Sequence, residues 1–321
     1  MDGWCRHSPA RIRWPDAVPI GKSVVMPIGK SFDPRTALWA LRAGVAGTAA
    51  LVGPALVAAG DGRTDRAAWP AVALWWAMVA VQVVAVMVPG AMGLTALRML
   101  APAGVVAAAG ALVGGASTGA GVAALAVAMV TTAIAFSAEA GEALVQGAAY
   151  GHERRLPLRM PVAHLPAAVV AWIMWCAALV WAVLLLGARM WVLGAITAAA
   201  AVGLTWLFAR RLHRFSRRWL VLVPAGVVLH DHVVLGETLM VPKANVHRVA
   251  LAYADTQALD LSGPAAGHAL QVTVSEMVTI LLAATRGEPK GKAVHAGAFL
   301  IAPSRPGRAL NALGAAGLPV A

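Results

Sequence analysis

The chain of 321 residues contains only two cysteines, Cys5 and Cys176, and only 12% of its residues are charged. Two cysteines cannot form a disulfide framework or a thiolate metal site. Soluble globular proteins carry about 25% charged residues, so the shortage of charge argues against an ordinary soluble domain. The sequence also lacks a glycine-rich phosphate loop with its lysine and a His-Glu-x-x-His zinc motif. We therefore expect a protein that is not an enzyme and has no cofactor.

Apolar residues, in contrast, make up 60% of the chain, and its mean hydropathy is +0.73. Six segments approach the length of about 20 apolar residues that is needed to cross a bilayer. They cover residues 37–59, 70–88, 99–117, 120–141, 166–187 and 190–209. We expect an α-helical integral membrane bundle of six transmembrane helices over residues 37–209. Residues 1–36 are rich in Pro, Gly and Arg and lack a sustained periodicity, so they are predicted to be a disordered N-terminal segment.

The basic residues predict the orientation of these helices. The net charge is +12, and nearly all of this surplus lies in residues 1–218. If the N-terminus is cytoplasmic, 15 lysines and arginines lie beside the cytoplasmic helix ends and 3 in the outer loops. Positive residues favour the cytoplasmic side. We therefore expect a multi-pass protein of the cytoplasmic membrane with both termini in the cytoplasm. Residues 219–321 are nearly neutral, which argues against a nucleic-acid partner.

The last apolar segment ends in a basic seam over residues 210–218. Its five arginines are Arg210, Arg211, Arg214, Arg217 and Arg218. After the seam come short runs rich in β-branched and aromatic residues, separated by turn signals, which are typical of β-strands. The expected strands cover residues 219–223, 226–230, 237–241, 246–253, 257–261, 269–274, 278–283 and 293–301. One helix is expected over 304–314 with Ser304 as its N-cap. Residues 219–321 are thus predicted to form a small β-barrel or sandwich with one C-terminal helix.

Three stretches of this last third carry a family resemblance. They are Arg218-Trp-Leu-Val-Leu-Val-Pro-Ala-Gly-Val-Val-Leu-His-Asp231, Val241-Pro-Lys-Ala-Asn-Val-His-Arg-Val249 and Phe299-Leu-Ile-Ala-Pro303. With the closing helix, they resemble the bacterial pleckstrin-homology-like (PH-like) domains that follow transmembrane helices. The resemblance implies a cytoplasmic interaction module or lipid-facing module without catalytic residues. The basic residues of this last third are scattered among six acids. This favours a protein partner over lipid headgroups.

Four charged residues are expected in the cytoplasmic layer of the bundle. Arg42 lies in the first turns of the first predicted helix, Arg98 just before the third, and Glu139 and Glu142 in the last turns of the fourth. Intramembrane ionisable groups are costly and often mark pathways. One interpretation is a proton or cation site on the two acids, gated by Arg98. The other is that the acids pair with Arg42, Arg98 or the arginines at 154 and 155, or reach interfacial water.

His230 and His232 are the only candidates for a metal site. Residues two apart on a strand point to one face, so both could bind zinc with a third ligand such as His247. The alternative is that His230-Asp-His232 is a polar turn between two apolar strands. Because a closed zinc site needs four ligands, the sequence favours the turn.

The sequence leaves two classes of function open. The first is a non-enzymatic scaffold or regulatory protein that presents the PH-like domain to a protein partner. The loop over residues 151–166 would be the surface that the domain touches. The second is a small transporter or channel that uses Glu139 and Glu142, with the domain as regulator. Gln82 is the only clear polar residue at mid-bilayer depth, which favours the scaffold. Gly110 and Gly114 form a Gly-xxx-Gly step that predicts close helix packing.

Overall fold

The computed structural model describes residues 33–60, 69–253, 255–284 and 287–321. Within these ranges, six helices are long and apolar enough to cross a membrane, so the chain is a multi-pass membrane protein, as predicted. They are α1 (Pro34–Gly60), α2 (Trp69–Met87), α3 (Ala91–Gly114), α4 (Thr118–Phe136), α6 (Leu165–Gly187) and α7 (Trp191–Ser216). The disordered segment expected over 1–36 lies outside the described residues as far as residue 32. Its last residues, from Pro34, belong to α1.

Two helix ends differ from the prediction. The third helix begins at Ala91 rather than at residue 99, so Arg98 lies within α3 and not before it. The sixth helix continues through three arginines of the basic seam and ends at Ser216. Hydropathy marks where a segment leaves the hydrocarbon, but arginine is a good helix former, so the helix itself continues past that point.

The fourth predicted segment, 120–141, is divided into two helices. Ser137 has an extended backbone and ends α4. Its hydroxyl then accepts a hydrogen bond from the Ala140 backbone N–H (3.1 Å) and caps the short helix α5 (Ala138–Gln146). Glu139 therefore lies in the first turn of α5 rather than in the last turns of the fourth helix. An acid in a first turn is favoured by the helix dipole.

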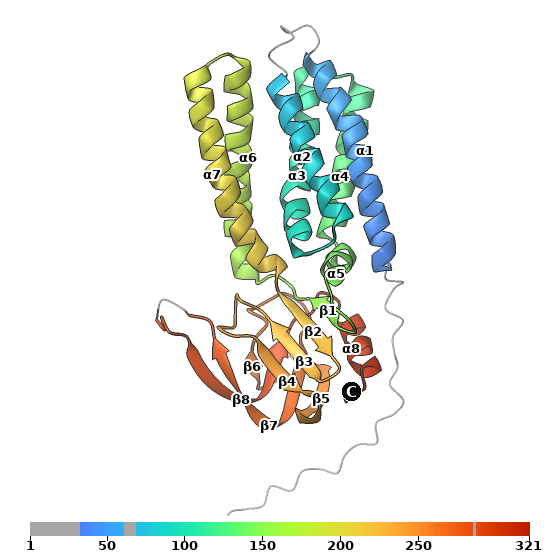
Figure 1. The fold of residues 1–321 in the computed structure, drawn as a ribbon, viewed down its shortest axis with the longest axis vertical. Helices are drawn as coiled ribbons and strands as arrows, with labels where there is room; N and C mark the ends of the chain where they lie inside the picture. The colour runs from blue at the N-terminus through green and yellow to red at the C-terminus, as the bar shows by residue number, and fades with distance from the viewer. Residues whose placement is uncertain (1–32, 61–68, 254, 285–286) are drawn as a thin grey trace, which may run out of the picture. The chain divides into compact units, whose positions relative to one another are not determined.

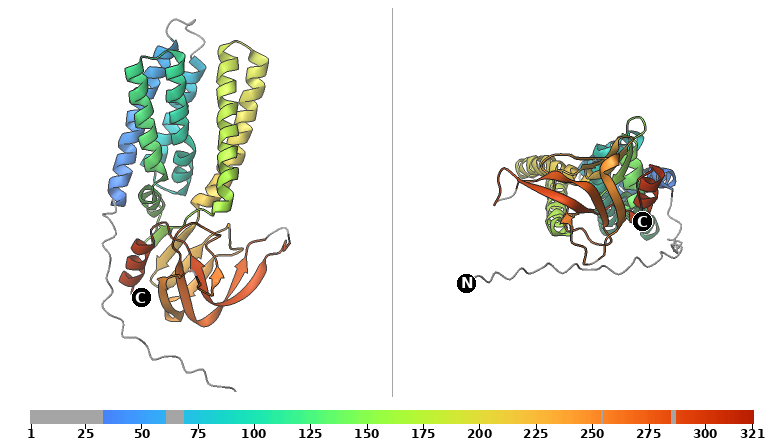
Figure 2. Two further views of the ribbon diagram at one scale, coloured as in Figure 1. Left: turned by 180° about the vertical axis from the view of Figure 1, so that it is seen from behind. Right: turned by 90° about the horizontal axis from the view of Figure 1, so that it is seen from below.

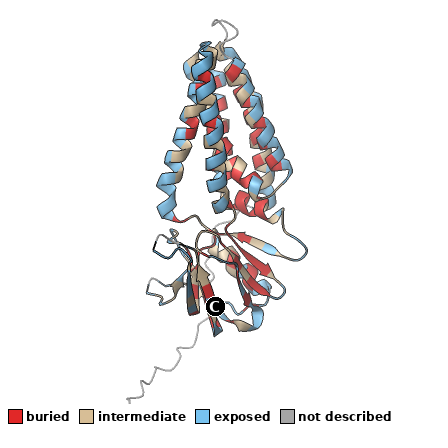
Figure 3. Ribbon diagram, turned by 60° about the vertical axis from the view of Figure 1, so that its left-hand side comes forward, coloured by how far each residue is buried: buried red, intermediate tan, exposed pale blue. Residues whose placement is uncertain are grey.

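The membrane helices form a bundle, α1 to α4, and a hairpin, α6 with α7 (Figure 1). Small residues allow close packing in the bundle: a Cβ added to Gly114 would lie 2.9 Å from the Cβ of Ala59 on α1. The outward sides of the helices are exposed (Figure 3). On the hairpin these exposed side chains are large and apolar, as in Val170, Trp181 and Ile196. Such a surface is suited to contact with lipid.

The C-terminal region is rich in strands and contains two four-stranded sheets among the described residues. The first sheet has the order β1 (Arg154–Pro157), β2 (Trp219–Val223), β3 (Gly226–His230) and β4 (Leu239–Pro242). The second has the order β5 (Val246–Leu251), β7 (Leu270–Leu282), β8 (Lys292–Ile301) and β6 (Leu259–Asp260). The helix α8 (Pro306–Ala315) follows (Figure 2).

Three details of this sheet region differ from the sequence prediction. The segments 269–274 and 278–283 form a single strand, β7, whose pairing with β8 is irregular between Thr273 and Val278. The α8 N-cap is Arg305, without a side-chain hydrogen bond, rather than Ser304. The third difference is β1, which comes from the loop between α5 and α6 and pairs with β2. The sequence of β1, Arg-Arg-Leu-Pro, contains no β-branched or aromatic residue, so it gives no strand signal.

Strand β2 is buried on both faces. Leu220 and Leu222 point into a core that residues of both sheets and α8 share. Trp219 and Val221, on the opposite face, belong to a cluster with residues of α1, α2, α3 and α5. The first sheet therefore packs against the end of the bundle at which Arg42 and Glu139 lie, and both faces of the sheet are occupied.

An ionic junction between the membrane helices and the sheet region

The two acids of α5 pair with arginines of the sheet region. The Arg305 Nη2 lies 2.6 Å from Glu139 Oε1, and the Arg308 Nη1 lies 2.9 Å from Glu142 Oε2. Arg154 of β1 contacts the second acid from another side, with its Nη2 3.5 Å from Glu142 Oε1. We call these five residues the α5–α8 junction. It joins a helix of the membrane part to the last helix of the chain.

The carboxylates are the buried side of the junction. The side chains of Glu139 and Glu142 are 8% and 9% exposed, whereas those of Arg305 and Arg154 are 51% and 47% exposed. Burying a carboxylate is costly unless it is paired and hydrogen-bonded. The arginines satisfy that requirement, while their own partial exposure keeps part of the interaction open to water and salt.

Among the described ion pairs, neither Arg42 nor Arg98 pairs with the two acids that the sequence grouped with them. Arg42 donates from Nε to the Val86 carbonyl (3.1 Å). Arg98 donates to the Ala135 carbonyl (3.4 Å) and lies beside α5, since a Cβ on Gly141 would be 3.1 Å from its Nη2. The described ion pairs of the two acids go to the junction arginines. The pair of Glu142 with Arg154 is one that the sequence suggested, whereas the pairs with Arg305 and Arg308 are not.

Sequence reasoning missed Arg305 and Arg308, which lie 166 residues from the acids that they meet. One signal was present. The acids are three residues apart on α5, and the arginines are three residues apart at the start of α8, with Arg305 as its N-cap. Residues with this spacing lie on one helix face. Two faces of opposite charge with the same spacing are complementary, but nothing in the sequence shows that these two helices meet.

A second ion pair lies inside the sheet region. Arg218, the last arginine of the basic seam, is 2.7 Å from Asp231 Oδ2, and the two side chains are 1% and 0% exposed. Arg218 also donates to the backbone carbonyls of Arg159 and Ser262. Asp231 Oδ1 accepts the backbone N–H of Val233 at 3.0 Å. This seam arginine therefore organises the fold, in addition to any effect on membrane orientation.

Two further arginines of the basic seam, Arg214 and Arg217, also contact the sheet region. Arg214 donates to the backbone carbonyl of His232 (3.2 Å), and Arg217 Nη2 lies 3.4 Å from His230 Nε2. The basic seam thus connects the end of α7 to β3 and to the residues that follow it.

His230 has partners on both ring nitrogens. Its Nε2 faces Arg217, its Nδ1 lies 3.2 Å from the Thr238 hydroxyl, and the ring stacks on Trp219 with centroids 5.2 Å apart. Burial first, and then the positive charge of neighbours such as His232 and Arg217, lowers the pKa of His230 to about 4. The neutral imidazole is therefore the stable form here.

The suggested metal site does not gather a ligand set. The His230 and His232 rings lie edge to face, with centroids 4.4 Å apart. Among the residues that the structure describes, no three His, Cys, Asp or Glu side chains come together as a metal ion would require. His247, the third ligand considered, is exposed on β5. Comparisons with protein-family models, with curated proteins and with solved structures found no match to this chain.

Proposed function

We propose that this protein is a non-enzymatic scaffold or regulatory protein of the cytoplasmic membrane that holds a PH-like domain at the cytoplasmic face. The observation that carries the proposal is the α5–α8 junction, in which the last helix of the sheet region is paired with two buried acids of the membrane part. The 15 to 3 distribution of basic residues supports the cytoplasmic placement.

The arrangement of the two sheets supports a protein partner. The outer face of the first sheet is occupied by the bundle through Trp219 and Val221. Among the described residues, none of the second sheet belongs to that cluster. Two large side chains there are exposed: Met277 of β7 is 76% exposed, and Tyr253, two residues after β5, is 81% exposed. Aromatic residues and methionine are enriched at protein interfaces. We propose that the partner docks on the second sheet.

The alternative function, transport through the bundle, receives less support. Glu139 and Glu142 are engaged by arginines. Gln82 is 1% exposed, and its side-chain nitrogen has no partner within the described structure. One buried amide does not make a continuous polar path, which a solute or ion needs to cross a bilayer.

Photocrosslinking in native membranes tests the proposal. A photoreactive residue is placed at Tyr253 or at Met277 of the full chain. The control position is Met129 on α4, which is 56% exposed but belongs to a membrane helix. We expect one discrete protein adduct of the same mass from both sheet positions and none from Met129.

Two results would contradict the scaffold. One is the absence of any discrete adduct from both sheet positions. The other is solute or ion flux in proteoliposomes that is lost in Glu139→Gln, which would favour the transporter instead. Glu153→Gln is the matched control for the flux measurement, because Glu153 pairs with Arg155 outside the membrane helices.

A further inference from the structure

Among the described residues, the hydrogen bonds between the hairpin and the bundle lie near the sheet region. Met99 of α3 packs in a cluster with Trp175 and Phe208 of the hairpin. The Trp172 indole donates to the Met99 carbonyl (3.0 Å), and the Thr95 hydroxyl lies 3.0 Å from His213 Nδ1. These contacts lie in the first third of α3 and the last turns of α7, near the sheet region. They fix the hairpin there.

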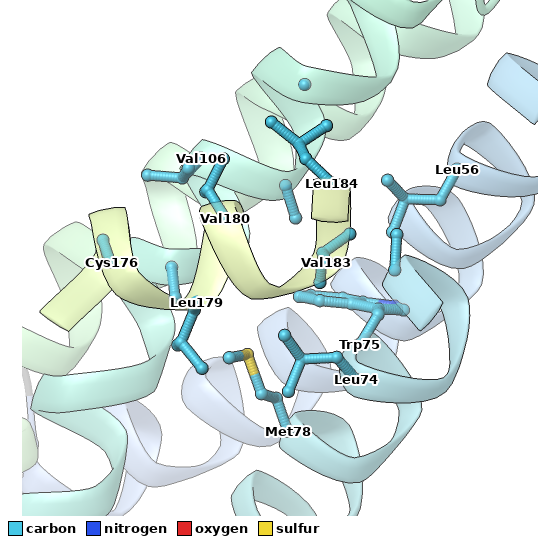
Figure 4. A pocket seen from close by; sticks show the side chains of 14 residues that line it. Leu56, Leu74, Trp75, Met78, Val106, Cys176, Leu179, Val180, Val183 and Leu184 are labelled. Carbon is cyan, nitrogen blue, oxygen red and sulfur yellow. The ribbon is translucent and has the colours of Figure 1, made fainter. Parts of the chain in front are cut away.

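Farther from the sheet region the two parts separate around a cavity of about 230 Å³ (Figure 4). Its walls come from the first half of α2, from Ala103 onward in α3, from Cys176 onward in α6 and from Leu56 of α1. Both α3 and α6 run away from the sheet region at these positions (Figure 1). The cavity therefore lies in the half of the membrane that is remote from the sheet region.

The walls of the cavity are apolar. Every lining residue is Ala, Gly, Val, Leu, Met, Cys or Trp. The indole nitrogen of Trp75 is the only nitrogen or oxygen in these side chains, and it lies toward α1, since a Cβ on Gly53 would be 3.5 Å from it. Water needs two to four polar partners to occupy a buried site. Water and polar ligands are thus disfavoured.

The cavity is also open to the lipid-facing surface. Val106, Val180 and Leu184 line it and are 37%, 42% and 57% exposed. Val180 and Leu184 belong to the same exposed apolar face of α6 as Trp181. The opening lies on a face suited to lipid, so the acyl chains of the bilayer are the molecules that surround it. A hydrocarbon chain is thin enough to enter.

We propose that this cavity binds one acyl chain of a membrane lipid from the leaflet remote from the sheet region. The chain fills the space between α2, α3 and α6, which the helices do not close by themselves. The proposal goes beyond the scaffold function and does not depend on the partner of the second sheet.

Gly110 provides the test, because a Cβ added there meets no atom within 4 Å and projects from a cavity-lining residue. Gly110→Phe would fill the cavity. Gly203→Phe is the matched control, since Gly203 is an exposed glycine of α7 that also has open space around a Cβ. Ala71→Leu reaches the same cavity from α2 and serves as the second filling variant.

The protein is reconstituted in phosphatidylcholine vesicles that contain a phospholipid with a photoreactive group midway along one acyl chain. After irradiation, peptide mapping locates the adducts. We expect labelling of Met78, Val106 and Leu184 to exceed that of Met129 and Val130, which face lipid on α4. It should fall several-fold in Gly110→Phe and Ala71→Leu and stay at the wild-type level in Gly203→Phe.

Labelling that is even over all exposed helix faces, or that Gly110→Phe and Ala71→Leu leave unchanged, would overturn the proposal. So would a crosslinked dimer joined through these residues, because a second copy would then occupy the cavity. Thermal unfolding in detergent is measured for each variant. If both filling variants unfold, the uneven labelling of the wild-type protein still decides the question.

Discussion

Two sets of arginine–carboxylate pairs differ in how far water reaches them. Arg218 and Asp231 are enclosed in the sheet region, with side chains 1% and 0% exposed. In the α5–α8 junction, only the carboxylates are buried, and Arg305 is half-exposed. The first pair connects parts of one fold, whereas the second connects that fold to the membrane helices.

This difference sets what each pair can do. If an enclosed pair loses one partner, the other is left as a buried charge without water or a counter-ion. Such a pair therefore strongly favours the one conformation in which both partners are present. A partly exposed pair can be replaced by water and ions at small cost. We infer that the Arg218–Asp231 pair fixes the fold of the sheet region. The junction fixes where that region sits and is the part that a partner or salt could release.

The largest expected effect follows from removing the enclosed carboxylate. Asp231→Asn leaves the Arg218 charge buried without a counter-ion, and we expect the free energy of unfolding to fall by about 3–5 kcal/mol. Thermal unfolding in detergent, followed by size-exclusion chromatography, measures it. Asp260→Asn is the control, because Asp260 is exposed and accepts only the Ser262 N–H among its described contacts. An equal loss of unfolding free energy in Asp231→Asn and Asp260→Asn would show that the enclosure of the Asp231 carboxylate is not the cause.

A smaller effect is expected at the junction. Arg305→Glu places a like charge beside Glu139, and we expect a loss of about 1–3 kcal/mol, less than for the enclosed pair because Arg305 is half-exposed. Hydrogen–deuterium exchange should show faster exchange in α8 and α5 while the strands stay protected. In the wild-type protein, higher salt should act in the same direction, because exposed charges are screened.

The reversed pair tests whether the two residues act together. Arg305→Glu combined with Glu139→Arg should recover part of the protection of α8, since it restores opposite charges. Arg248→Glu, an exposed change on β5, is the control and should leave α8 protected. If the double variant exchanges as fast as the single one, the ion pair does not hold the junction together.

The smallest expected effect concerns His230, which precedes Asp231 of the enclosed pair in the sequence. Its folded pKa is about 4, below the value of about 6.5 in an unfolded chain. Between these values the unfolded state binds the proton and the folded state does not, so stability should fall as pH drops from about 6.5 toward 4. His230→Gln should weaken this dependence. The measurement is thermal stability at pH 7 and pH 5, with exposed His247→Gln as the control. An unchanged dependence in His230→Gln would show that other groups cause it.

The membrane part was largely predictable from the sequence. Long apolar segments must become helices in a bilayer, because every backbone polar group has to be hydrogen-bonded within the segment. For that reason each of the six expected spans coincides with a long helix, although the fourth also runs into α5. The strands that begin at Trp219 and Gly226 were also predicted at their correct bounds, because short β-branched runs between turn signals are a local pattern. The break at Ser137 was missed, since hydropathy does not register a polar cap within an apolar run.

Some features were decided only by the tertiary structure. The sequence places Glu139 and Glu142 near a membrane surface, but two of their three partners, Arg305 and Arg308, come from the start of α8 at the other end of the chain. The short strand β1, which contains Leu156, pairs with β2. In the sequence, the two membrane helices α6 and α7 lie between these strands. Charge spacing and hydropathy are local properties, whereas these contacts depend on which surfaces the folded helices and sheets bring together. The sequence by itself therefore determined where the chain crosses the membrane and where strands begin. The three-dimensional packing determined which acids meet which arginines.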